Sequence, residues 1–417
     1  MMKNSLKPVV SAVLLAMVAA PASAVDFSGY VRAGIGIDTA GGGVQGGDEF
    51  QKQKLGRLGN EFDTYSEIGL GQELFNDDGK SVYFQSMFEM SSDGFSETEK
   101  TTDDSANFSI KQLNMQAKGY IAAAPEAVVW AGKRFYQRHD LHIIDTKYWN
   151  VSGYGFGLEG VQMGPGALST AIIRGDQDGL NINYVDVRYA GMKPWQGAWV
   201  EVGIDYGMTN PTDQQEKDNV DFDNGLMLTA ELSQSFSMGY NKTVLQYMDK
   251  GLAQNAVSQG GGWYDVWSGD VNSAKGYRLI NTGDINIGDN IIIDHVFTYG
   301  YAQDHGVVNG VKVDDETLLS LVARPTYNWS KYNKTVLELG YFTQTKKLVS
   351  GSESKTGGNK VTISQVLATG EGFFARPEIR FYASYFKDTE GKSFNVVDQV
   401  AQDEDSVKLG VQIEAWW

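Results

Sequence analysis

The chain ends on the sequence VKLGVQIEAWW, residues 407–417, in which two kinds of side chain alternate strictly. One set of positions is entirely apolar: Val407, Leu409, Val411, Ile413, Ala415 and Trp417. The intervening positions are charged, polar, small or aromatic: Lys408, Gly410, Gln412, Glu414 and Trp416. Because successive side chains of a β-strand point to opposite faces, this period of two predicts a strand with one apolar face and one polar face.

The same alternation recurs at residues 199–208, 226–233 and 378–385, with no helical block between the segments. A soluble β-sandwich alternates too, so a secreted β-rich enzyme or lectin is an alternative at this point. The predicted strands are roughly 9 to 11 residues long, which matches a tilted crossing of a bilayer. The terminal Trp417 lies on the apolar face, where an interfacial aromatic girdle belongs. The pattern therefore favours a transmembrane antiparallel up-and-down β-barrel.

The first 24 residues have the features of a secretion signal. Lys3 and Lys7 precede an apolar run at residues 9–20, and Ala22-Ser23-Ala24 is a small-residue cleavage site. We therefore expect residues 1–24 to be removed and residues 25–417 to form one barrel in the bacterial outer membrane. Downstream of residue 25 charged or amide residues interrupt every apolar stretch of about 18 residues, so a barrel is the remaining way to span lipid.

Composition narrows the class of protein further. The 49 glycines and the 21 Tyr, 19 Phe and 9 Trp residues are typical of barrels, where strands approach closely and aromatic girdles form. A net charge of −17 argues against nucleic acid as a partner. With no cysteine, disulfides are excluded. We find no motif that positions catalytic groups or a cofactor, and expect neither an enzyme nor a bound cofactor.

Polar, glycine-rich segments predict the long connections of the barrel, at residues 39–49, 91–107, 249–276 and 346–360. At about 20–24 residues per strand and connection, the mature chain accommodates 16 to 18 strands. Barrels of that width enclose an aqueous channel.

Several blocks of sequence carry a family resemblance. They are VDFSGYVRAGIG at residues 25–36, RLGNE at 57–61, the segment 130–149, Arg376-Pro377, and IEAWW at 413–417. Together they resemble the maltoporins. The resemblance implies 18 strands, a homotrimer in the outer membrane, one loop folded inward to narrow the channel, and passive diffusion of maltose and maltodextrins.

The resemblance also implies two sets of channel-lining residues. An aromatic ladder would contact the apolar faces of the sugar rings, and its members here would be Tyr30, Tyr65, Phe95, Tyr240, Phe374 and Trp416. A polar track would bind the hydroxyl groups, and its members would be Arg32, Arg57, Glu67, Lys111, Arg138, Asp140 and Asp145. The chain departs from the family at the narrowest point, where Lys147 replaces an aromatic residue.

Strand parity provides a check that is independent of the family. Tyr30 and Trp416 each lie on the polar face of their strand, and in a closed barrel the first and last strands must pair, which brings these two rings together. By the same parity Arg32, Arg57, Tyr65, Glu67 and Phe374 face the channel. Lys111 does not, since it shares parity with apolar neighbours, so a bulge or a late strand start is needed for it to face inward.

Two alternatives concern the site itself. The cation Lys147 motivates a channel of the same fold for another oligosaccharide, of sucrose type or carrying charge. If these residues formed a helix, the spacing of His139, His142 and Asp145 would place three possible metal ligands on one face. We favour a structural and pore-lining role for these three residues, and expect no metal.

Overall fold

The computed structural model describes residues 24–94, 97–102, 105–176, 179–217 and 222–417. The predicted signal peptide, apart from Ala24, and the predicted ladder residue Phe95 lie outside these residues.

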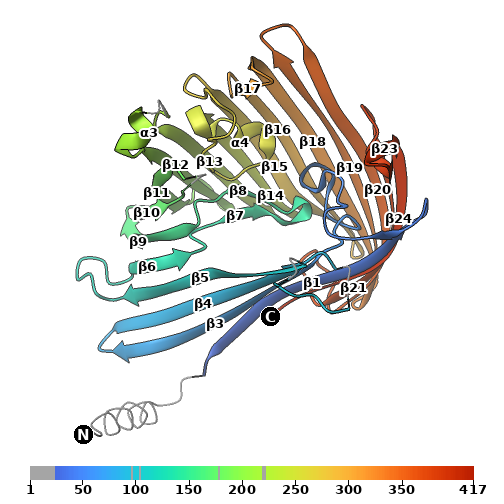
Figure 1. Ribbon diagram of the computed structural model, residues 1–417. Helices are drawn as coiled ribbons and strands as arrows, with labels where there is room; N and C mark the ends of the chain where they lie inside the picture. Colours follow the sequence, from blue (N-terminus) through green and yellow to red (C-terminus); the bar gives the residue numbers. More distant parts are fainter. Residues whose placement is uncertain (1–23, 95–96, 103–104, 177–178, 218–221) are drawn as a thin grey trace, which may run out of the picture.

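The described chain forms a closed barrel of 18 antiparallel strands (Figure 1). The barrel closes where the first strand pairs with the last, with Tyr30 directly opposite Trp416. This confirms the predicted architecture and the predicted pairing. The strands are β1 Asp26–Asp38, β3 Thr64–Asp77, β4 Lys80–Ser92, β5 Ala106–Lys118, β6 Val128–Arg134, β9 Gly153–Met163, β10 Gly166–Arg174, β11 Asn181–Met192, β12 Ala198–Asn210, β13 Gly225–Phe236, β14 Gly239–Asp249, β15 Lys275–Ile287, β16 Ile291–Gln303, β18 Val311–Ser330, β19 Asn333–Leu348, β20 Glu353–Ala368, β21 Glu378–Asp388 and β24 Asp405–Trp416.

The two faces of the barrel wall differ as the alternation predicted. In β24, Leu409 and Ile413 are 40% and 43% exposed on the outer face, whereas Lys408 and Glu414 are 4% and 0% exposed on the inner face. Apolar side chains therefore face outward and polar side chains face the bore, the reverse of a soluble β-sandwich.

Strands are joined by short turns at one end of the barrel and by longer connections at the other. Residues 78–79 and 164–165 are examples of the short turns, whereas residues 39–63 and 250–274 belong to the long connections. The prediction of a long loop at 346–360 was wrong, because β19 and β20 leave only residues 349–352 between them. Where strands extend beyond the apolar belt, neither face needs apolar side chains. The polar composition of this hairpin therefore resembled that of a loop.

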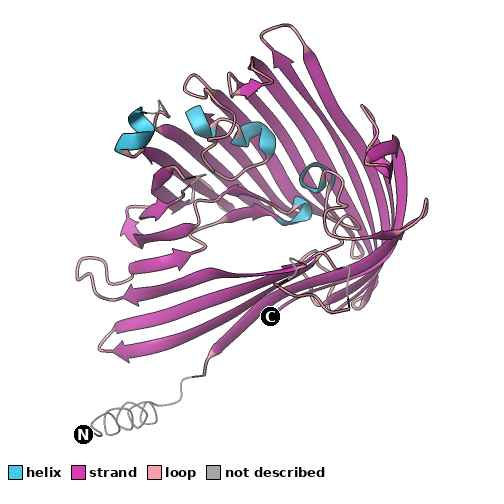
Figure 2. Cartoon of the chain, in the orientation of Figure 1, coloured by secondary structure: helices cyan, strands magenta, loops and turns pink. Residues whose placement is uncertain are grey.

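The bore is partly filled by segments folded in from the long-loop end. These segments include the connection 39–63 with α2 Lys52–Leu55, the connection 135–152, and the connection 250–274 with α4 Asn255–Ser258, each of which contributes buried side chains. Only one inward loop was implied by the family resemblance. Figure 2 shows how small the helical part is beside the strands. None of the helices in the described ranges is long and apolar enough to cross a membrane.

The remaining elements are short and lie within the connections. They are β2 Gly43–Val44, β7 His139–Leu141, η1 His142–Ile144, β8 Thr146–Trp149, α3 Asp213–Lys217, η2 Lys250–Leu252, β17 Val307–Val308, β22 Phe394–Val397 and β23 Val400–Asp403.

Candidate functional site

The connection 135–152, which we call the constriction loop, lies inside the barrel against strands β11 to β14. One anchor of the loop is Trp149, whose ring is fully buried and whose Nε1 donates a hydrogen bond of 2.7 Å to Asp205. Gly203 makes room for this ring, since a Cβ there would lie 2.4 Å from Cζ2 of Trp149. The loop is therefore seated by packing that only a glycine in the wall permits.

Wall arginines hold the backbone of the same loop. Arg188 donates to the carbonyl of Gln137 at 2.6 Å, and Arg278 donates to the carbonyl of Tyr148 at 2.8 Å. A backbone carbonyl is an obligatory acceptor, and a charged donor makes a stronger bond than a neutral one. Packing and charge-assisted bonds together fix the loop in the bore.

A continuous row of aromatic rings lines the bore where β1, β3 and β24 meet. Tyr65 and Tyr30 have ring centroids 5.9 Å apart, and Tyr30 and Trp416 lie 6.4 Å apart with their planes inclined by only 17°. Phe374 continues the row at 6.4 Å from Trp416. Tyr240 lies beyond, in an adjoining cavity of about 230 Å³ that Phe374 also lines. Rings from distant parts of the chain thus form one path.

The ring row and the constriction loop face each other across a cavity of about 390 Å³. Most of the predicted ladder and track residues meet here, joined by His142. The lining residues are Tyr30, Arg32, Arg57, Tyr65, Glu67, Arg138, Asp140, His142, Asp145, Lys147, Phe374 and Trp416.

Polar partners hold the side chains of this cavity in place. Arg57 donates to the hydroxyl of Tyr30 at 2.8 Å and pairs with Glu61 at 2.8 Å and with Glu414 at 2.9 Å. The Tyr30 hydroxyl in turn donates to Glu414 at 2.8 Å. Since each charged group already has a partner, the network presents fixed dipoles to the bore rather than mobile ions.

A second set of contacts covers the end of the ring row near Tyr65. Arg32 forms a two-pronged bond with Asp63, at 3.0 and 2.7 Å, and its guanidinium lies 4.8 Å from the centroid of the Tyr65 ring. The Tyr65 hydroxyl donates to Glu67 at 2.6 Å. The charge and the ring thus position each other.

Charges around the loops favour ionised carboxylates. Burial opposes ionisation of Asp145, but the cations Lys147, Arg57 and Lys52 outweigh it and lower the pKa of that carboxyl. Burial also opposes ionisation of Glu61, but Arg57 and other nearby cations outweigh it and lower the pKa of this carboxyl to about 2. These two carboxylates therefore stay charged at neutral pH.

His142, for which a structural and pore-lining role was expected, lines this cavity. Its ring lies 5.5 Å from Trp416 and 5.8 Å from Phe374, and Arg57 lies 2.8 Å from its Nε2. Burial and the neighbouring Arg57 charge lower the pKa of this imidazole, so it is neutral at pH 7. Phe374 belongs to the connection 369–377 between β20 and β21. No local sequence pattern indicates that this connection contacts the constriction loop.

The spacing of His139, His142 and Asp145 would suit a metal on a helix, but these residues do not form a helix. His139 lies in β7, His142 in a 3-10 turn, and Asp145 follows in the left-handed region with φ 52°. The three side chains have different partners: His139 contacts wall glutamates, His142 contacts Arg57, and Asp145 contacts lysines.

Three parity predictions need comment. Arg57 and Phe374 reach the cavity, but neither lies in a strand, so parity did not apply to them. Lys111 is the extra residue of a β-bulge in β5, between the pairs Met87–Gln112 and Phe88–Ile110. The bulge turns Lys111 inward, where its Nζ lies 2.5 Å from Glu89, which confirms that a bulge was needed.

A closed barrel with an apolar outer face, a polar bore and a loop that narrows the bore defines an outer-membrane porin. The family comparison agrees: the model of the LamB porin family matches residues 25–417. The chain belongs to the LamB porin family.

Curated relatives match over the whole chain. Maltoporin 1 of Aeromonas salmonicida (strain A449) is 50% identical, with 100% of each chain covered. Maltoporin 2 of Yersinia pseudotuberculosis serotype O:1b (strain IP 31758) is 49% identical, again with 100% of each chain covered. Among solved structures, OccAB4 of Acinetobacter baumannii is 10% identical, with a TM-score of 0.49 over 95% of this chain and 98% of that one.

Proposed function

We propose that this porin conducts maltose and maltodextrins by facilitated diffusion along the ring row. The observation that carries the proposal is the row itself: Tyr65, Tyr30, Trp416 and Phe374 follow one another at centroid spacings near 6 Å along one side of the cavity. Glucosyl rings expose flat C–H faces, which aromatic rings remove from water. The names of the full-length relatives, maltoporins, point to the same substrate class.

The spacing of the rings suits transport better than storage. By analogy with other aromatic stacking, each ring contributes about 1–2 kcal/mol. Several similar shallow sites allow a sugar to step from one ring to the next, whereas one deep site would retain it. No energy source is needed, because the solute moves down its own gradient.

The polar track opposite the rings lowers the cost of dehydration. Sugar hydroxyls leave water as they enter, and the charged lining of the cavity offers hydrogen bonds in return. Arg138 and Asp140 come from the constriction loop, whereas Arg32 and Glu67 come from the wall, so hydroxyls on more than one side of a sugar can be bound. On the family resemblance, the proposed site also includes Lys111 and Tyr240, which do not line this cavity, and Phe95, which lies outside the described residues.

Block of ion current by sugar tests the proposal. Reconstituted in planar bilayers, the full-length porin should show a current that falls in a saturable way as maltohexaose is added, because a bound chain fills the constriction. An unaltered current at high maltohexaose concentration would count against the proposal.

A second candidate function is motivated by Lys147. Its Nζ lies 2.8 Å from Asp145, yet the side chain is 34% exposed at the constriction, where it can meet a solute. A cation there favours a charged or differently shaped oligosaccharide. The test compares the half-blocking concentrations of maltohexaose, sucrose and an anionic oligosaccharide for wild type and Lys147→Tyr. If both proteins rank the three sugars in the same order, Lys147 does not determine selectivity.

We also propose that the protein acts as a homotrimer embedded in outer-membrane lipid and holds no cofactor. Support comes from the resemblance to maltoporins and from the apolar outer face of the barrel. Members of the porin family are channels rather than enzymes. Mass measurement of the detergent-solubilised protein tests the assembly: a monomer mass after mild extraction would contradict it.

A further inference from the structure

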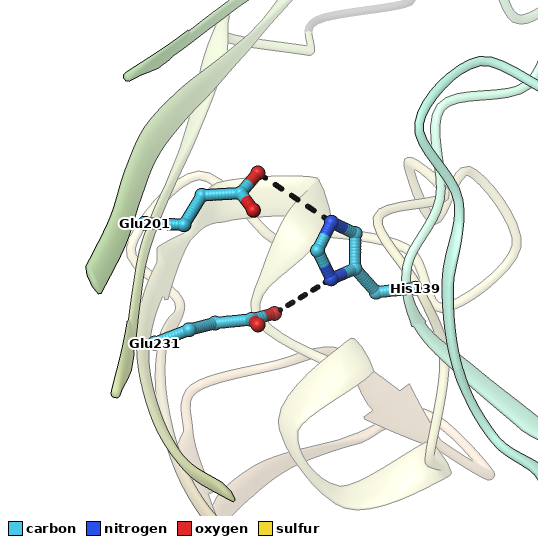
Figure 3. Close-up of side chains that lie close together, drawn as sticks. All are labelled: His139, Glu201 and Glu231. Atoms are coloured by element: carbon cyan, nitrogen blue, oxygen red, sulfur yellow. Dashed lines mark ion pairs between the residues drawn. The ribbon is translucent and has the colours of Figure 1, made fainter. Parts of the chain in front are cut away.

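A histidine of the constriction loop and two glutamates of the barrel wall meet inside the barrel (Figure 3). His139 belongs to the loop, whereas Glu201 and Glu231 project from the neighbouring wall strands β12 and β13. Nδ1 of His139 lies 2.9 Å from Glu231, and Nε2 lies 3.4 Å from Glu201. One ligand atom from each residue lies within 4.8 Å of the others.

The two glutamates are directly opposite one another in the β12–β13 ladder. Like charges in this position destabilise a sheet unless cations intervene. Glu231 is well compensated, because Lys242 lies 3.1 Å away and the Tyr148 hydroxyl donates to it at 2.6 Å. Glu201 forms no ion pair in the described part of the chain except with His139. Compensation of the Glu201 charge therefore depends on His139 or on a cation bound beside it.

The geometry around the imidazole suits a metal ligand. Each imidazole nitrogen contacts one carboxylate, Nδ1 that of Glu231 and Nε2 that of Glu201. A divalent cation that replaces the Nε2 proton would leave Nδ1 donating to Glu231, and the Nε2 lone pair would then point toward Glu201. The 3.4 Å between Nε2 and the Glu201 oxygen is long for a charge-assisted hydrogen bond. Two ligands each about 2.1 Å from a tetrahedral zinc ion lie about 3.4 Å apart.

Space for the remaining coordination is available. His139 and Glu201 line an open cavity of about 460 Å³, together with Lys242 and Ser169. The wall residues of this cavity include Ala167 and Ala190, which lie near the short-turn ends of β10 and β11. Water can therefore reach the site from that end of the barrel and complete the coordination shell.

We propose that Nε2 of His139 and the carboxylate of Glu201 bind a divalent zinc-type cation, with water as the other ligands. Glu231 does not bind the metal; it holds the imidazole through Nδ1, in the carboxylate–histidine–metal arrangement common at zinc sites. Because His139 is on the constriction loop and Glu201 is on the wall, the ion joins the two. Neither His139 nor the two glutamates line the cavity of the proposed sugar path.

Zinc titration of the intact, untagged porin in detergent tests the site without any sugar. Calorimetry at neutral pH should detect one Zn²⁺ per chain. His139→Gln and Glu201→Gln should abolish binding. Glu231→Gln should weaken it about 10–100-fold, since it removes only the residue that orients the histidine. His295→Gln is the matched control, because His295 contacts Asn281 on β15 and should leave binding unchanged.

An anomalous-scattering map of the wild-type protein crystallised with zinc needs no variant. The expected peak lies between His139 and Glu201, about 2.1 Å from Nε2. The absence of zinc binding, binding that His139→Gln leaves intact, or a peak elsewhere only would overturn the proposal. In those cases a proton on Nε2 would be the cation between the two residues.

Discussion

Tyr30 combines two interactions that a sugar channel needs. Its ring stacks beside Trp416 in the row, while its hydroxyl donates to Glu414 and accepts from Arg57. Arg57 and Glu414 also contact each other directly at 2.9 Å, so they keep a partner if the hydroxyl is removed. The ring and the hydroxyl can therefore be tested separately.

Tyr30→Ala and Tyr30→Phe should differ in sugar block. Loss of the ring removes about 1–2 kcal/mol of stacking, which corresponds to a half-blocking concentration of maltohexaose about 5–30-fold higher. Tyr30→Phe keeps the ring and should change the value only a few-fold. The measurement is current block in planar bilayers. Equal damage by both variants would show that stacking on Tyr30 is not what binds the sugar.

Glu61 provides a pH prediction for the connection 39–63. Its pKa is lowered to about 2 from the ordinary 4.5, so its ionised form stabilises the fold above pH 4.5, and this stability is lost as pH falls toward 2. The shift corresponds to about 3 kcal/mol at neutral pH. Thermal unfolding should show Glu61→Gln less stable than wild type at pH 7, with the difference narrowing below pH 4.5. A constant difference between pH 7 and pH 2 would contradict this assignment.

At the scale of single residues, sequence was informative inside strands and less so outside them. Parity placed Tyr30, Tyr65 and Trp416 on the channel side, because a strand has only two faces. Arg57 and Phe374 lie in connections, where no fixed period relates neighbouring side chains. Their positions depend on contacts with distant segments.

Among the elements, the constriction loop depends most on a single wall position. Gly203→Ala places a Cβ 2.4 Å from Trp149 Cζ2, so the ring and the loop must shift. We expect a larger or more variable single-channel conductance and weaker maltohexaose block. Gly43→Ala is the matched control, since its Cβ would meet only a backbone oxygen at 3.8 Å. Wild-type conductance and block in Gly203→Ala would show that the loop is not seated by this contact.

Elements also show where local sequence rules reach their limit. The failed parity of Lys111 correctly indicated a bulge, because one extra residue reverses the faces of a strand. By contrast, the polar segment 346–360 was mistaken for a loop although most of it pairs in β19 and β20. A polar sequence indicates that a segment is exposed to water, but it does not indicate the backbone conformation of that segment. Strand ends that extend beyond the membrane are exposed, so they are polar like loops.

For the whole molecule, the orientation of the wall can be tested by placing charge on its outer face. Ile204 is 44% exposed in the middle of β12. Ile204→Arg should destabilise the barrel in lipid by about 2–4 kcal/mol, because a charge at mid-membrane must leave water. Val349→Arg, in the short turn after β19, should cost close to nothing. Denaturant unfolding after refolding into vesicles measures both; equal stabilities would contradict an outer face embedded in lipid.

The overall architecture was predictable because one repeated local pattern determines it. Length and strand period limited the barrel to 16–18 strands, and the family resemblance implied 18. The filling of the bore was less predictable: connections 39–63 and 250–274 enter it through side chains such as Leu55 and Tyr264, both fully buried. Such packing joins residues far apart in sequence, which no local period encodes.

We propose that sugar travels along the rings of Tyr65, Tyr30, Trp416 and Phe374, and a crystal structure of the porin soaked with maltohexaose would show the path. We expect glucosyl units in van der Waals contact with these rings and hydroxyls within hydrogen-bond distance of the polar side chains opposite. Sugar bound only outside the bore, or in the bore away from the ring row, would contradict it.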